Sequence, residues 1–214
     1  MAAPDDFTDG KVEYETDGRS GDASEGEDAE FEFGPYSVSG VRRNLDVSSD
    51  ELGDLENFAP ADKRGFTYLL GGGGKTKLRA HCAERAPKKT KALDGSVTTA
   101  DEEPPLACAC DEAGNNVTQL FVEDLAGEYS GPLTVGGVDA RVVGVYILAN
   151  GDLRRGRPLG YRVEDSEGIV AGADVGSGES RVWFRKNLEE PSRRQIACAL
   201  AGLMLWVPPA SPDH

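Results

Sequence analysis

Apolar and polar positions alternate along much of the chain between residues 64 and 185, which predicts a series of short, half-buried strands. In the segment that follows Gly71–Gly74, Leu78, Ala80 and Cys82 fall on one face and charged side chains fall on the other. The four glycines separate this segment from the apolar residues 66–70. Two strand-like segments joined by a glycine-rich turn predict a β-hairpin.

Similar short segments recur at a spacing of roughly ten residues, with turn residues between them. They cover residues 106–110, 117–122, 133–135, 138–149, 159–164, 169–175 and 181–184. The pattern predicts a mainly β fold, an antiparallel barrel or sandwich of about nine short strands.

The pattern changes after residue 187, where a helix is predicted over 191–207. Pro191 is placed near its start, and Pro208 and Pro209 end it. Residues 196–207 are apolar on all sides, interrupted only by Gly202. A helix of this kind is either surrounded by protein or spans a membrane, and twelve residues are too few to span hydrocarbon, which needs about 20. We therefore expect the strands to pack around this C-terminal helix.

Charge divides the chain into an acidic leader and a nearly neutral body. Of 214 residues with a net charge of −15, the first 34 hold twelve acidic residues against Lys11 and Arg19. Such a composition predicts a disordered arm over residues 1–44. Its aromatic residues alternate with acids, so Phe31, Phe33 and Tyr36 are candidates for docking a partner protein, and the acids would suit a basic one. A purely solvating tail is the alternative.

A short amphipathic helix is predicted over residues 45–58. Ser48 or Ser49 can cap it, Leu52 and Leu55 share one side, and Pro60 ends it. The predicted organisation is therefore an arm (1–44), this short helix (45–58) and a β-rich domain (64–207).

Composition excludes several classes of partner and location. The acidic balance argues against nucleic-acid binding and against docking on anionic lipid by charge. No basic segment followed by an apolar segment is found after Met1, and no transmembrane segment is predicted. These features predict a cytoplasmic protein, in which the four cysteines would be free thiols.

Chemical motifs are few. Gly71–Thr76 lacks the first glycine of a phosphate-binding loop and precedes a strand, so a hairpin turn is favoured over nucleotide binding. Cys108 and Cys110 share a face of one strand and with Cys82 could form a zinc or redox site, although small buried core residues are the favoured interpretation. With two histidines and no nucleophile motif, no catalytic site, metal or cofactor is predicted.

Residues 161–175 form a hairpin pattern, followed by Arg181-Val-Trp-Phe and the apolar helix. This order resembles the tubby-like, phospholipid-scramblase and LURP-one group over residues 106–207. The resemblance implies a closed antiparallel barrel with the C-terminal helix threaded through it, and binding of membrane lipids or a scaffold role. The basic phosphoinositide cluster, the palmitoylated cysteines and the calcium loop of that group have no counterpart here, so no site residue transfers.

These observations predict a non-enzymatic intracellular binding or scaffold domain. Partner contact is expected through the arm and through a basic face formed by Lys75, Lys77 and Arg79. Two alternatives stay open: a lipid or small-molecule binding protein, and a zinc or redox site at the cysteines.

Overall fold

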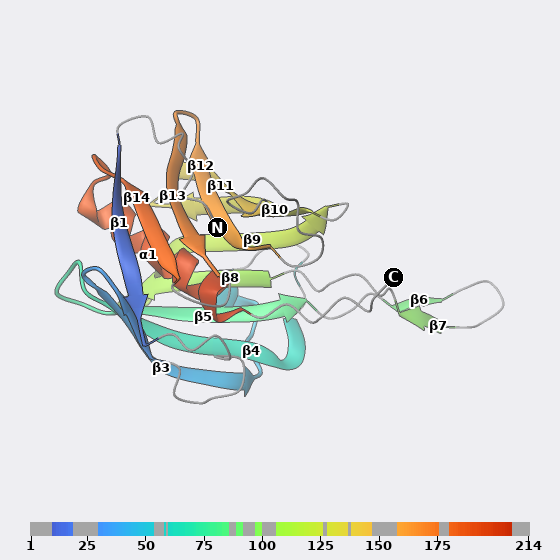
Figure 1. Ribbon diagram of the computed structural model, residues 1–214. Coiled ribbons are helices and arrows are strands. Elements are labelled where there is room, and N and C mark those ends of the chain that lie inside the picture. Colours follow the sequence, from blue (N-terminus) through green and yellow to red (C-terminus); the bar gives the residue numbers. More distant parts are fainter. Residues whose placement is uncertain are drawn as a thin grey trace.

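A closed antiparallel barrel of twelve strands forms the body of the computed structural model (Figure 1). The structure describes residues 10–18, 30–53, 58, 60–85, 89–91, 97–99, 106–125, 128–136, 138–146, 158–175 and 180–206. Around the barrel the strands follow the order β1 (Lys11–Asp17), β14 (Arg181–Arg185), β13 (Gly168–Asp174), β12 (Gly160–Asp165), β11 (Val138–Val145), β10 (Glu128–Val135), β9 (Asn115–Leu125), β8 (Leu106–Glu112), β5 (Leu78–Arg85), β4 (Pro60–Gly71), β3 (Tyr36–Leu45) and β2 (Phe31–Phe33). Two further strands, β6 (Lys89–Lys91) and β7 (Val97–Thr99), pair with each other in a separate small sheet.

The expected helix is present as α1 (Glu190–Leu205), and it lies inside the ring of strands (Figure 1). It contacts β3, β5, β8, β9, β10 and β13, which come from widely separated parts of the chain. Every residue from Ile196 to Leu205 is buried, as a helix that is apolar on all sides requires. The barrel interior is therefore a packed core made by the helix and the inward side chains of the strands.

The prediction of a β fold around a buried helix is confirmed, but the prediction of about nine strands is wrong. Part of the difference comes from residues that were assigned to the disordered arm. β1 pairs with β14 from Lys11↔Arg185 to Glu15↔Arg181 and closes the barrel. In β1 the half-buried residues Val12 and Tyr14 alternate with exposed charged residues. Such a strand has the composition of a disordered segment although one of its faces packs on the core. Residues 1–9 and 19–29 of the predicted arm lie outside the described residues.

The helix predicted over 45–58 is also wrong within the described part. Leu45 ends β3, and only Asp50–Leu52 form a turn of 3-10 helix, η1; residues 54–57 lie outside the described residues. The physical reason is tertiary packing. Leu52 is fully buried in a cluster of apolar side chains on the outer surface of the barrel. This outer cluster consists of Val47, Leu52, Phe58, Ala83 and Ala107. Val47, Leu52 and Phe58 of this segment are all buried against Ala83 and Ala107, so contacts with β5 and β8 decide its conformation and local helix propensity does not.

The glycine run joins β4 to β5 and forms the predicted hairpin. At Gly72 the backbone has a φ of +90°, and a Cβ atom would overlap the carbonyl oxygen of Pro35. The loop is therefore packed against the chain between β2 and β3. It does not form an open cradle for a phosphate group.

Candidate functional site

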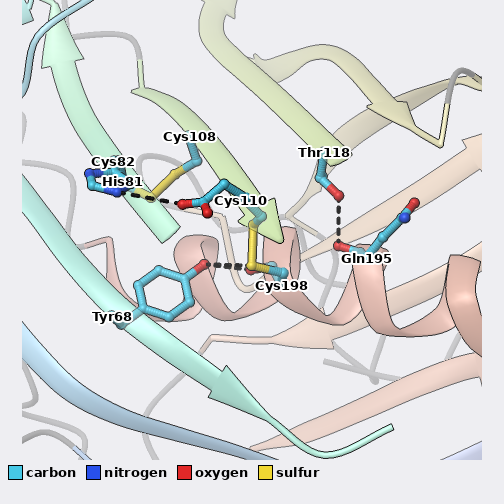
Figure 2. The surroundings of a disulfide bond; sticks show 9 residues. Tyr68, His81, Cys82, Cys108, Cys110, Thr118, Gln195 and Cys198 are labelled. Carbon is cyan, nitrogen blue, oxygen red and sulfur yellow. Dashed lines mark hydrogen bonds and ion pairs between the residues drawn. A yellow bond between two sulfur atoms is a disulfide. The ribbon is translucent and has the colours of Figure 1, made fainter. Parts of the chain in front are cut away.

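All four cysteines are paired in two disulfide bonds (Figure 2). Cys82 in β5 is bonded to Cys108, its direct neighbour in β8, and Cys110, two residues further along β8, is bonded to Cys198 in α1. The second bond links the central helix covalently to the barrel wall. The prediction of free thiols is wrong because the shared face of Cys82, Cys108 and Cys110 points at the helix, where the sulfur atoms meet in pairs.

The same pairing removes the zinc alternative at Cys82, Cys108 and Cys110, since a disulfide sulfur carries no thiolate to bind metal. These four side chains are at most 1% exposed, so an external thiol or substrate has no direct access to them. Disulfides persist in oxidising compartments and are rare in the cytosol. The disulfide pairing is therefore unusual for a cytosolic protein. The cytoplasmic location stays a prediction.

Tyr68 holds the helix beside the second disulfide. Its hydroxyl group donates a hydrogen bond of 2.5 Å to the carbonyl oxygen of Cys198, as Figure 2 shows. Burial raises the pKa of the Tyr68 phenol far above its usual range, so the group stays neutral and keeps its proton for this bond. The hydrogen bond and the disulfide together fix the position of α1 against the barrel wall.

The aromatic candidates of the predicted arm lie in the core. Phe31, Phe33 and Tyr36 are at most 2% exposed, and the rings of Phe33 and Tyr36 are 5.5 Å apart. The Tyr36 hydroxyl donates a hydrogen bond of 2.8 Å to Glu190 at the start of α1. Their role in docking a partner is therefore contradicted: these side chains of β2 and β3 point inward, and the exposed residues between them are Glu32, Gly34 and Pro35.

The predicted basic residues do lie on the surface. Lys75, Lys77 and Arg79 are exposed, Lys75 in the hairpin loop and Arg79 on the outer face of β5. Lys77 and Arg79 line a groove of about 680 Å³ on the outside of the barrel, whereas Lys75 lies outside its lining. We call this depression the outer groove.

Strand register explains the floor of the outer groove. Leu69 in β4 pairs with Arg79, Arg79 pairs with Asp111 in β8, and Asp111 pairs with Asn116 in β9. These four side chains lie side by side across the sheet and span about 14 Å, because neighbouring strands are about 4.8 Å apart. His81, two residues along β5 from Arg79, belongs to the same outer face.

One wall of the outer groove is η1, with Asp50 and Glu51 at its edge. The outer cluster holds this turn on the barrel, and the side-chain amide of Gln119 donates a hydrogen bond of 2.8 Å to the carbonyl oxygen of Gly53. The opposite end is formed by Thr76 and Lys77 and by the β8–β9 turn at Ala113 and Gly114. The site is therefore built from segments that are far apart in the sequence.

His81 lies between two carboxylates in this groove. Its Nδ1 atom is 3.3 Å from Oε1 of Glu51, and its Nε2 atom is 3.8 Å from Oδ2 of Asp111. Ser48 donates to the other oxygen of Glu51 from its backbone N–H and from its hydroxyl group, and the backbone bond is the main reason that the pKa of Glu51 is lowered. The other oxygen of Asp111 accepts a hydrogen bond from the Gly114 N–H.

Three other charged side chains of the outer groove do not take part in the contacts around His81. Lys77, Arg79 and Asp50 make no ion pair or hydrogen bond through their side chains with another residue of the described part of the chain. From the sequence, Lys77 and Arg79 were predicted as contact residues and His81 was given no role, and Asp111 and the η1 wall were not predicted at all. The alternation in residues 78–82 puts His81 beside Arg79, but no local signal shows that residue 51 folds over them.

Below the groove, a buried arginine connects the barrel rim to the helix. Arg194 of α1, 7% exposed, makes an ion pair of 2.8 Å with Glu112 and donates to the carbonyl oxygen of Thr76. The hydroxyl group of Thr76 donates to the same carboxylate, and this contact is the main reason that the pKa of Glu112 is lowered. This network positions the end of the β4–β5 hairpin.

Comparisons with known proteins find no matching family model, no matching curated protein and no matching solved structure. Within the described ranges no helix is long and apolar enough to cross a membrane. The same ranges contain no set of three or more His, Cys, Asp or Glu side chains arranged to hold a metal ion. The outer groove is therefore the feature from which a function can be inferred.

Proposed function

We propose that the protein is a non-enzymatic binding domain, and that it takes a segment of a partner protein in the outer groove. The observation that supports this proposal is a groove of about 680 Å³ whose lining includes charged side chains of both signs that have no partner among the described residues. Ligand sites in proteins have volumes of about 300–1,000 Å³ and a few polar groups that orient the ligand.

The shape of the groove favours an extended segment. Its floor crosses four strands and spans about 14 Å, which an extended chain covers with about four residues. The rigid strands and the disulfide between Cys82 and Cys108 hold this floor in place. A binding surface that is already ordered loses little conformational freedom when the partner docks.

The contacts of His81 argue against catalysis in the groove. Each ring nitrogen faces a carboxylate that is itself held by backbone N–H donors. A general base needs a nitrogen within hydrogen-bond reach of the substrate proton. His81 lies between η1 and β8 with both ring nitrogens turned toward protein carboxylates, which favours a binding role for the groove.

A lipid-binding role is our second proposal. A closed antiparallel barrel around an apolar helix is the architecture that the resemblance to the tubby-like and scramblase group implies. Flotation of the purified protein with vesicles that contain 20% phosphatidylserine or phosphoinositide tests it. Recovery in the floating fraction supports the proposal, and recovery only in the dense fraction contradicts it.

The binding proposal is tested by selecting a displayed library of random twelve-residue peptides on the full chain. We expect enriched peptides that bind the wild-type protein and bind the double variant Lys77→Glu/Arg79→Glu at least tenfold more weakly. The variant Lys186→Glu is the matched control, since Lys186 is an exposed cation outside the groove lining. Selection without enrichment, or peptides that bind the wild type and the double variant equally well, would contradict the proposed function.

A further inference from the structure

Three charged side chains of the outer groove have no partner in the described part of the chain, two of them basic and on or next to β5, and one acidic and on η1. Lys77 lies at the end of the groove that the β4–β5 hairpin forms, Arg79 lies in the floor between Leu69 and Asp111, and Asp50 lies on the η1 wall. All three residues are exposed. Since charged groups of both signs are present, the groove is matched to a ligand that itself carries both signs.

The remaining charges of the lining are already engaged. Glu51 is held by Ser48 and faces His81, and Asp111 accepts from the Gly114 N–H and faces the other nitrogen of His81. A ligand that bound these groups would have to break contacts that hold η1 and the β8–β9 turn. Lys77, Arg79 and Asp50 are therefore the groups that recognise a partner.

Resting on the proposed function, we infer that the outer groove selects a partner segment that carries an acidic residue and a basic residue a few positions apart. The acidic side chain binds Lys77 and Arg79, and the guanidinium of Arg79 offers the two parallel N–H donors that suit a carboxylate. The basic side chain binds the carboxylate of Asp50. Leu69, which pairs with Arg79 across the floor, supplies an apolar surface for the residues that separate them.

The overall charge of the protein supports a segment of balanced charge. With a net charge of −15, the molecule repels an approaching acidic segment at a distance. A segment that is only basic would meet Lys77 and Arg79 inside the groove. A segment with one charge of each sign avoids both penalties, so the groove discriminates by repulsion as well as by attraction.

Synthetic ten-residue peptides test this inference by fluorescence anisotropy. One set places Glu and Lys two to five positions apart, in both orders, in a Gly/Ser/Ala/Leu background; Glu-only, Lys-only and uncharged sets are compared with it. We expect one order of the mixed set to bind best. Because exposed ion pairs contribute up to about a fivefold change in affinity each, Asp50→Ala should weaken it about two- to fivefold, and the double variant Lys77→Glu/Arg79→Glu should weaken it more than tenfold.

Charge reversal gives the sharper test. The triple variant Asp50→Lys/Lys77→Glu/Arg79→Glu should prefer the opposite order of Glu and Lys, while Lys186→Glu keeps the preference of the wild type. All the substituted residues are exposed, so the unfolding midpoint should stay unchanged and serves as the folding control. Reversed preference supports the inference. If Glu-only peptides bind in the groove as tightly as mixed ones, or if the triple variant keeps the original order, the inference is overturned and the binding function stands. If no peptide of any set binds, the proposed function fails with it.

Discussion

Removing the disulfide between Cys110 and Cys198 should destabilise the protein strongly. This bond closes a loop with a sequence separation of 88 residues, and the bond between Cys82 and Cys108 closes one of 26. In the chain-entropy description, loops of these lengths stabilise the folded state by about 4.6 and about 3.5 kcal/mol. The two loops do not overlap along the chain, so their contributions should add to about 8 kcal/mol.

That sum is as large as the whole free energy of unfolding of many domains, about 5–15 kcal/mol. We therefore expect Cys110→Ala/Cys198→Ala to lower the free energy of unfolding by about 4–5 kcal/mol and Cys82→Ala/Cys108→Ala by about 3–4 kcal/mol. Guanidinium unfolding followed by circular dichroism measures both changes. The reduced wild-type protein is the control, because it loses both bonds and keeps every sulfur atom.

Two results would contradict this expectation. Wild-type protein denatured without reductant should show no thiol that reacts with Ellman's reagent; four reactive thiols would mean that the bonds do not form. A loss of less than about 1 kcal/mol on reduction would mean that the bonds form without restricting the unfolded chain. In the native state the sulfurs are at most 1% exposed, so reduction should need prior unfolding and be slow.

Three further predictions concern single residues. Gly72→Ala should cost about 2–4 kcal/mol, because a Cβ would overlap the carbonyl oxygen of Pro35, whereas Gly114→Ala, with a φ of +86° and nothing within 4 Å, should cost about 1 kcal/mol; equal unfolding midpoints would contradict this. Gly202→Ala should destabilise the protein by about 1 kcal/mol although alanine has a better helix propensity than glycine, because the new methyl group would lie 3.1 Å from a disulfide sulfur that cannot move away. A higher midpoint of thermal unfolding in the variant would contradict this prediction. The lowered pKa of Glu51 contributes stability that is present above its ordinary value of 4.5 and is lost as the pH falls through the lower folded value. Urea unfolding at pH 7 and pH 3 should therefore show a larger acid loss for the wild type than for Glu51→Gln, and equal losses would contradict the role of the Ser48 bond.

The central helix and the β4–β5 hairpin could be predicted because their signals are local. Residues 196–207 are apolar on every side, and the alternation of residues 78–82 comes soon after four glycines. Burial of Leu78, Ala80 and Cys82 confirms the predicted inner face of that strand. In both places the residue pattern and the tertiary environment agree.

The first barrel strands and the η1 wall could not be predicted, because tertiary contacts override their local signals. Lys11–Asp17 alternates correctly for a strand, but its outer face is charged and its partner, β14, lies at the other end of the chain. Leu52 is buried by Ala83 and Ala107, which come from β5 and β8. The sequence pattern placed Cys108 and Cys110 on one face of a strand. The partner of Cys110 is Cys198 on the helix, and no pattern in the strands predicts that pairing.

The closed architecture also constrains how the chain folds. The barrel is complete only when Lys11 meets Arg185, and its core is filled only by residues 196–205. During synthesis the inner faces of the first strands therefore stay exposed until β14 and α1 have been made. Such long-range closure predicts slow folding and a period in which the nascent chain depends on protection from aggregation.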